Sequence, residues 1–192
     1  MPKLVLASTS PFRRELLAKL GLPFEVDSPD IEESRRPDET PERLVARLAE
    51  EKARAVGNRH PDSLIIGSDQ VAVIGDTILG KPGSHDRAKA QLQAASGKSV
   101  RFLTGLCLYH SGSDRVQILV EPFEVMFREL NERQIENYLL AERPYQCAGS
   151  FKSEGLGIAL FERLLGDDPN SLIGLPLIRL TRMLEAEGVQ VI

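Results

Sequence analysis

The first residues whose types suggest chemistry are Arg13 and Arg14, in the stretch STSPFRREL at positions 8–16. A helix that begins at Pro11 places both arginines in its first turn, where the helix dipole favours acidic side chains instead. The free N–H groups of that turn and the two guanidinium groups can together bind a polyanion. A nucleotide phosphate is the simplest candidate.

Asp69 is the acidic residue with the strongest catalytic pattern. It follows the apolar run 64–66 through Gly67 and Ser68, and a second apolar run follows at 71–74. A carboxylate at the end of a buried strand is either a structural hydrogen-bond acceptor or a catalytic group, and the pattern leaves both open. A catalytic Asp69 would hold a metal ion or deprotonate a water molecule.

Three further charged residues indicate little when each is taken alone. Lys81 lies in a tight turn, Lys52 lies on a predicted helix where charged residues usually face solvent, and Glu33 lies in a charged loop, 31–39. Together with the arginine pair and Asp69, they supply cations for phosphates and carboxylates for a divalent metal. That set suits a nucleoside triphosphate with its metal, although spacing does not show that the residues converge.

Two glycine-bounded loops are candidate ligand contacts. GSFKSEG, at 149–155, carries Ser150, Lys152 and Glu154, and GDDPNSLIGLP, at 166–176, has Asn170 as a predicted helix start. Glycines allow close approach of a ligand, yet the same pattern serves ordinary turns. Neither loop has the spacing of a P-loop or a dinucleotide-binding fingerprint.

Composition narrows the class of protein. The net charge of −4 over 192 residues argues against non-specific nucleic-acid binding, which needs a basic face. The two cysteines, Cys107 and Cys147, have no disulfide or metal-site spacing, which favours a reducing compartment. The apolar run at 3–7 is too short for a signal peptide or a membrane span. We therefore expect a cytoplasmic protein without a membrane partner.

Strand and helix patterns alternate along the chain and predict one mixed α/β domain over 1–192. Helix caps are expected at Ser10, Thr40 and Asn131. The predicted strands and helices are a strand at 3–7, a helix from Pro11 to about Leu20, a strand within 23–29, a helix from Thr40, a β-rich segment at 63–75 interrupted by GSDQ, a helix at 84–96, a hairpin of 99–110 and 115–130, a helix at 131–142, a strand late in 147–166 and a C-terminal helix.

Several blocks occur in the order and spacing of Maf-like nucleotide pyrophosphatases, and the resemblance runs from end to end. They are LVLASTSPFRRELL, EKA at 51–53, IIGSDQV, GKP at 80–82, CAGSFKSEG and GDDPNSLIGLPL. The resemblance implies an elongated, mixed-sheet α/β fold similar to inosine triphosphate pyrophosphatase, with a cleft between two lobes. It also implies hydrolysis of nucleoside triphosphates to monophosphates and pyrophosphate with a divalent cation, magnesium or manganese.

The same resemblance assigns roles to residues of this sequence. It implies that Asp69 is the proton acceptor that activates water, and that Glu33 contributes with Asp69 to metal binding. The phosphate-binding residues that it implies are Ser8, with its loop 8–10, Arg13, Arg14, Lys52 and Lys81.

Three positions resemble the branch of the family that acts on 7-methyl-GTP. Members that prefer dTTP and UTP often have Thr after the catalytic Asp and an Ile-Gln pair in the later loop, whereas this chain has Gln70 and Ser153-Glu154. The branch often has Trp where this chain has Phe12. A methylated guanine carries positive charge, so Phe12 can stack on it and Glu154 can pair with it. The alternative is that Phe12 packs in the core and Glu154 is solvated.

The resemblance therefore predicts a pyrophosphatase that converts 7-methyl-GTP to 7-methyl-GMP and pyrophosphate, and so removes a modified nucleotide from the pool. One alternative is the same reaction on dTTP or UTP. Another is a nucleotide-binding regulator of septum formation, the process after which the family is named. Family members can be dimers, so a homodimer is also an expectation.

Overall fold

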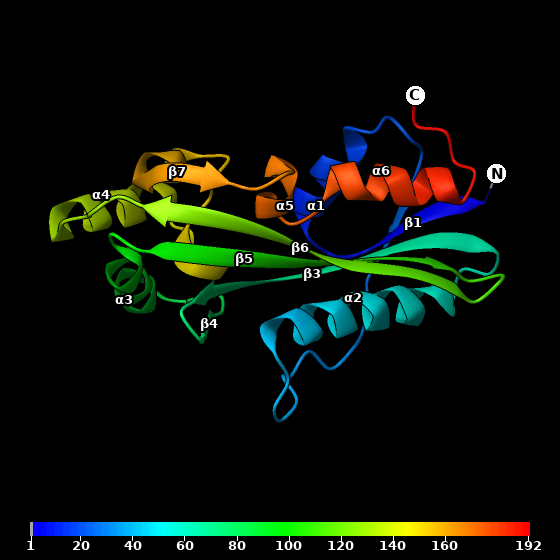
Figure 1. Ribbon diagram of the computed structural model, residues 1–192, viewed down its shortest axis with the longest axis horizontal. Helices are drawn as coiled ribbons and strands as arrows, with labels where there is room; N and C mark the ends of the chain where they lie inside the picture. The colour runs from blue at the N-terminus through cyan, green and yellow to red at the C-terminus, as the bar shows by residue number, and fades with distance from the viewer. Residues whose placement is uncertain (1) are drawn as a thin grey trace. The chain divides into compact units, whose positions relative to one another are not determined.

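The computed structural model describes residues 2–192, which form a mixed α/β fold (Figure 1). The expected fold class is confirmed. In chain order, with η for a 3-10 helix, the elements are β1 (Lys3–Ala7), α1 (Pro11–Ala18), β2 (Glu25–Asp27), α2 (Pro41–Gly57), β3 (Ser63–Ile74), β4 (Thr77–Leu79), α3 (His85–Ala95), β5 (Ser99–His110), β6 (Arg115–Phe127), α4 (Glu132–Glu142), η1 (Ala148–Ser150), η2 (Leu156–Leu160), β7 (Phe161–Leu165), α5 (Pro169–Ile173) and α6 (Leu177–Ala186).

The strands form a seven-stranded mixed sheet in the order β2-β1-β3-β5-β6-β7, with β4 paired to β3. Strand β1 is parallel to β2 and β3, whereas β4 and β7 are antiparallel to β3 and β6. Strands β5 and β6 are neighbours joined by the turn at 111–114, which confirms the predicted hairpin, because so short a link joins only antiparallel strands.

The chain divides into two compact units, and each is assembled from separate segments. Unit 1 comprises the chain up to Gln70 with Thr104–Glu121 and Asp168–Ile192, and unit 2 comprises Val71–Leu103 and Pro122–Asp167. Three of the changeovers fall within the long strands β3, β5 and β6, and the fourth falls in the loop before α5, so no single cut in the sequence separates the units. The single domain and the cleft implied by the resemblance stay predictions.

Unit 1 buries both faces of its strands, as the alternation of side chains in β1 shows. Leu4 and Leu6 pack in a cluster with leucines of α1 and α6, whereas Val5 and Ala7 pack against α2 on the other face. Figure 1 shows α2 on one side of these strands and α1 and α6 on the opposite side. This burial on two faces explains the continuous apolar runs of β1 and early β3.

Helix α2 lies directly on the strands of unit 1 at two glycines. A Cβ added to Gly67 of β3 would lie 2.0 Å from the carbonyl oxygen of Ala49, and one added to Gly105 of β5 would lie 2.1 Å from that of Val45. Since real Cβ atoms do not approach oxygen so closely, both positions require glycine for this packing. The contact fixes the height of α2 above β3.

Unit 2 has an aromatic core. Phe151 makes edge-to-face contacts with three other phenylalanines, at centroid distances of 5.2 Å to Phe102, 5.5 Å to Phe127 and 4.8 Å to Phe161. Such geometry is favourable beyond the apolar area that it buries. These rings hold the loop after η1 against strands β5, β6 and β7 of this unit.

The predicted caps are confirmed, because the side chains of Ser10, Thr40 and Asn131 accept from the third residue of α1, α2 and α4. A helix begins near residue 170 as expected, but Asn170 is not its cap. Asp168 is the cap of α5, and its Oδ1 accepts from the Asn170 N–H at 2.8 Å. A carboxylate before Pro169 therefore begins the helix.

The GSDQ segment does not interrupt a strand, which corrects a second expectation. Strand β3 runs without a break from Ser63 to Ile74, so Asp69 lies inside it and not at its end. The polar residues fit because Gly67 accommodates α2 and the buried Ser68 donates to the Gly174 carbonyl oxygen at 3.0 Å. Cys107 and Cys147 are free thiols. Between residues 2 and 192, no helix is both long and apolar enough to cross a membrane.

Candidate active site

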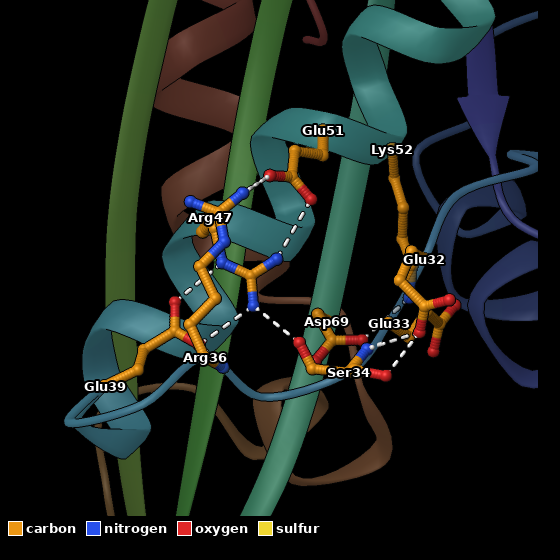
Figure 2. Close-up of polar contacts among 9 residues, drawn as sticks. All are labelled: Glu32, Glu33, Ser34, Arg36, Glu39, Arg47, Glu51, Lys52 and Asp69. Carbon is orange, nitrogen blue, oxygen red and sulfur yellow. Dashed lines mark hydrogen bonds and ion pairs between the residues drawn. The ribbon is translucent and has the colours of Figure 1, made fainter.

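A buried lysine and two carboxylates form the centre of the site in unit 1, here called the Lys52 centre. The Nζ atom of Lys52 lies 2.7 Å from Oδ1 of Asp69 and 3.0 Å from Oε1 of Glu33 (Figure 2). Lys52 is only 6% exposed and Asp69 only 9%. Lys52 is therefore not an ordinary solvated helix lysine, and its predicted role in phosphate binding stays a prediction.

The sequence does carry a signal for this burial. Lys52 follows Leu44 and Leu48 and precedes Val56 at intervals of four residues, which is the spacing of one helix face. Leu44, Leu48 and Val56 are all buried, so Lys52 occupies the apolar stripe of α2. A charged residue within such a stripe indicates a buried partner, in this case Asp69 of β3.

A catalytic or binding role explains the buried charges of the Lys52 centre better than a contribution to stability does. Removing two charges from water is unfavourable, and a buried ion pair is often no more stable than an apolar pair of similar volume. The centre also has one more negative than positive charge, so its carboxylates can accept from further ligands. Buried and interacting charges of this kind are typical of functional sites.

Arg13 lies close to these carboxylates. Its Nε atom donates at 2.9 Å to the carbonyl oxygen of Gly174, which also accepts from Ser68. Burial lowers the pKa of the Arg13 guanidinium, and the nearby charges of Asp69 and Glu33 offset part of that effect. The structure therefore brings Arg13 toward the Lys52 centre.

The other residues predicted in the first loop and helix are placed differently. Ser8 is buried, and its hydroxyl accepts from the Ser10 N–H at 3.1 Å, so this side chain supports the loop itself. Arg14 is exposed and Phe12 is half-buried. Phe12 is thus not a fully buried core residue.

Gln70 is held by groups that the sequence did not reveal. Its Nε2 donates to Thr104 Oγ1 at 2.9 Å and to the Ser171 carbonyl oxygen at 2.7 Å. Thr104 itself donates to the same carbonyl at 3.0 Å, so it must accept from Gln70. The orientation of the amide follows from this network, because a carbonyl oxygen can only accept.

The remaining predicted residues, Lys81 and Glu154, belong to unit 2, where both are exposed. The Ser153 hydroxyl lies 3.4 Å from Oε2 of Glu154. Their proposed contacts with substrate stay predictions.

The carboxylates fit a divalent metal that a nucleotide helps to bind. In the described part of the chain, no three His, Cys, Asp or Glu residues gather as a complete metal site. Asp69 and Glu33 nevertheless direct oxygens at one cationic point, the Lys52 ammonium. Magnesium is commonly held by one or two carboxylates together with substrate phosphates. The donor set of Asp69 and Glu33 suits that arrangement.

Comparison with known proteins points to one family. The model of the family "Maf-like protein" matches residues 3–187. A protein of Nitrosococcus oceani is 63% identical over 191 residues, covering 100% of this chain and 96% of its own length. One of Alcanivorax borkumensis is 62% identical over 189 residues, covering 98% and 96%. Both relatives are named 7-methyl-GTP pyrophosphatase.

Solved structures share the fold at low sequence identity. A HAM1 protein from Coxiella burnetii has a TM-score of 0.54 at 17% identity, over 97% of this chain and 100% of that one. The Staphylococcus aureus Ham1 protein has a TM-score of 0.53 at 12% identity, over 96% and 99%. The fold is shared, and the match over residues 3–187 together with the full-length relatives shows that the chain belongs to the Maf-like family.

Proposed function

We propose that this protein is a metal-dependent pyrophosphatase that hydrolyses 7-methyl-GTP to 7-methyl-GMP and pyrophosphate in the cytoplasm, and so removes a modified nucleotide from the pool. The observation that carries the proposal is the 63% identity, over the whole of this chain, to a protein named 7-methyl-GTP pyrophosphatase. The buried Lys52 centre supports it, because the reaction needs a positioned base.

In the proposed reaction, Asp69 accepts a proton from the water that attacks the α-phosphorus. A bond forms between the water oxygen and that phosphorus, the bond to the bridging oxygen breaks, and pyrophosphate leaves. Lys52 orients the Asp69 carboxylate through their 2.7 Å contact. A magnesium or manganese ion, held by Asp69 and Glu33 with the substrate phosphates, would supply neutralisation of negative charge.

The cations have the phosphate-binding role in this proposal. Arg13 and Arg14 lie in the first turn of α1, where the helix N-terminus also favours an anion. Lys52 and Lys81 would also bind the phosphate chain, Lys81 from its exposed turn. Ser8 would bind it together with its loop 8–10, in which the Ser10 N–H donates to the Ser8 hydroxyl.

Three residues would recognise the methylated base. Phe12 would stack on the positively charged ring, and Glu154 would pair with its charge. Because the N–H groups of Gln70 face Thr104 and Ser171, a ligand would meet the carbonyl oxygen of this amide. That acceptor suits the N–H groups of guanine.

A substrate panel tests the proposal. Pyrophosphate release is measured with 7-methyl-GTP, GTP, UTP, dTTP, CTP and inosine triphosphate, each with magnesium or manganese. We expect 7-methyl-GTP to be preferred and Asp69→Asn to lower turnover by about 10²–10⁴-fold while the protein stays folded, as for loss of a general base.

The other outcomes are equally informative. Near-wild-type turnover in folded Asp69→Asn would place the base elsewhere. Preference for UTP or dTTP would keep the enzyme but discard the roles of Phe12, Gln70 and Glu154. Nucleotide binding without pyrophosphate release would overturn the proposed activity and favour the regulator of septum formation.

A further inference from the structure

The charged loop 31–39, which carries Glu33, has no helix or strand to hold it. The Glu33 side chain is 58% exposed, and it contacts Lys52 at 3.0 Å. Because the Glu33 carboxylate is exposed, solvent screens this ion pair, and holding the exposed side chain in one geometry costs entropy. This contact alone is therefore too weak to keep the loop on α2.

Arg47 of α2 supplies a much stronger contact to the same loop. Its Nε and Nη2 atoms lie 2.6 and 2.8 Å from the two carboxylate oxygens of Glu39, at the end of the loop. Both side chains are nearly buried, with 13% and 8% exposed. Paired N–H donors on one carboxylate form a geometrically specific contact.

Glu39 is held from the loop side as well. Its Oε2 accepts from the backbone N–H of Arg36 at 3.0 Å. The hydrogen bonds from Arg47 chiefly lower the pKa of Glu39 to about 2, so this carboxylate is ionised at neutral pH. The pair thus persists across the pH range in which enzymes normally work.

The same guanidinium reaches the residue next to Glu33. Its Nη2 also donates to the carbonyl oxygen of Ser34 at 3.0 Å, while Nη1 donates to Glu51 of α2 at 3.0 Å. Arg36 from the loop donates to the other oxygen of Glu51 at 2.8 Å. Figure 2 shows Arg47 between α2 and the loop, with these contacts drawn as dashed lines.

We propose that Arg47 is a positioning residue that holds the charged loop 31–39 on α2, so that Glu33 meets Lys52 and Asp69. Arg47 donates hydrogen bonds to the carbonyl oxygen of Ser34, directly after Glu33, and to the carboxylate of Glu39. The backbone that carries Glu33 is therefore held on its C-terminal side. The proposal rests on the proposed function, in which Glu33 and Asp69 act together. Arg47 acts on the reaction only through Glu33.

The first test measures the loop without any nucleotide. Hydrogen–deuterium exchange of the backbone amides at 34–39 is compared between wild type and Arg47→Gln. Arg54→Gln is the matched control, because Arg54 also lies on α2 and binds two carboxylates, Glu50 and Asp114, each at 2.7 Å. We expect exchange to be at least about tenfold faster only in Arg47→Gln, because its loop amides open more often. Unchanged exchange would overturn the proposal.

The second test is a double-mutant cycle with Glu33→Gln, read as kcat/KM for pyrophosphate release. If Arg47 acts through Glu33, each single variant lowers kcat/KM by about tenfold or more, and the double variant is no worse than Glu33→Gln. Losses that multiply would overturn the proposal, because they would show that Arg47 acts independently of Glu33. A general loss of stability is monitored separately by thermal unfolding.

Failure of the proposed function is distinguishable from failure of this inference. If the wild type prefers another nucleotide, the substrate assignment fails and the cycle is run on that nucleotide. If no nucleotide releases pyrophosphate, the exchange measurement decides alone whether Arg47 holds the loop.

Discussion

The two units differ in what they bury. Unit 1 buries charged side chains, namely Lys52, Asp69, Glu39, Glu121 and Asp168, along with several serines and Thr104. Among the buried polar and charged residues of the described chain, Ser150 alone belongs to unit 2, whose interior contains the phenylalanine cluster.

Because of this difference, support for a functional role differs between the units: in unit 1 it comes from contacts between residues, and in unit 2 it comes from sequence resemblance. Three predicted site residues of unit 1, Glu33, Lys52 and Asp69, are joined by short contacts, so their placement constrains a mechanism. Lys81 and Glu154 of unit 2 are exposed, so their proposed roles depend on the ligand that they would meet. Burial of charge, and not charge itself, distinguishes Lys52 and Asp69 from the other charged residues predicted for the site.

The largest expected effect comes from removing one buried charge. Lys52→Met keeps much of the side-chain length but leaves Asp69 buried without its cation, so we expect a loss of about 3–5 kcal/mol in the free energy of unfolding. The matched variant Lys81→Met in unit 2 should change it by no more than about 0.5 kcal/mol. Urea denaturation measures the free energy of unfolding of both variants. Equal losses in Lys52→Met and Lys81→Met would show that the buried charge of Lys52 contributes no more to stability than the exposed charge of Lys81 does.

Lowering the pH should reveal the same difference between the two units, with a smaller change in the free energy of unfolding. The folded pKa of Glu39 is lowered from its ordinary value of 4.5 to about 2, so its contribution is present above pH 4.5 and is lost as pH falls toward 2. Glu39→Gln should lower stability at neutral pH by about 1–3 kcal/mol and weaken the acid dependence between these pH values.

Thermal unfolding of wild type and Glu39→Gln between pH 6 and 2.5 tests this expectation. Glu132→Gln is the control in unit 2, because Glu132 pairs with Lys89 but its side chain is 73% exposed. It should leave the acid dependence nearly unchanged, since solvent screens such pairs. If the unfolding temperature of Glu39→Gln depended on pH as that of the wild type does, the buried pair of Arg47 and Glu39 would not govern stability in acid.

The smallest expected effect concerns the preference for the methylated base. Glu154→Gln should lower the ratio of kcat/KM for 7-methyl-GTP over GTP by about fivefold or less, because an exposed charge pair contributes no more than about 1 kcal/mol. The unfolding temperature should not change. Glu162→Gln, another exposed acid of unit 2, is the control. A ratio that stays constant in Glu154→Gln would remove this residue from substrate recognition.

Local signals in the sequence predicted much of the fold. Ser10, Thr40 and Asn131 cap helices because a short polar side chain can satisfy a free N–H group within three residues, which needs no knowledge of tertiary structure. The hairpin of β5 and β6 was predictable for the same reason, because its two apolar strands are adjacent in the chain.

The partners within the site that sequence reasoning missed depend on tertiary packing, even where a local pattern, such as the apolar stripe around Lys52, indicates burial. The burial of Lys52 requires β3 to continue through Asp69, and that segment was expected to be interrupted. The pair of Arg47 and Glu39 depends on the path of a loop without regular structure. Charged residues in such loops have many possible partners, so neither pattern nor spacing selects the one that forms.

The glycine contacts under α2 have a consequence for experiments that map tolerance to mutation. A single methyl group at Gly67 would have to displace the helix backbone at Ala49, and with it both Lys52 and Arg47. In a screen of all single substitutions scored by growth or turnover, Gly67 would therefore group with Asp69, two positions later. Gly67 has no side chain that could take part in catalysis. Its substitutions would still resemble those of a catalytic residue, because Gly67 sets the distance between α2 and β3, the two elements that carry Lys52 and Asp69.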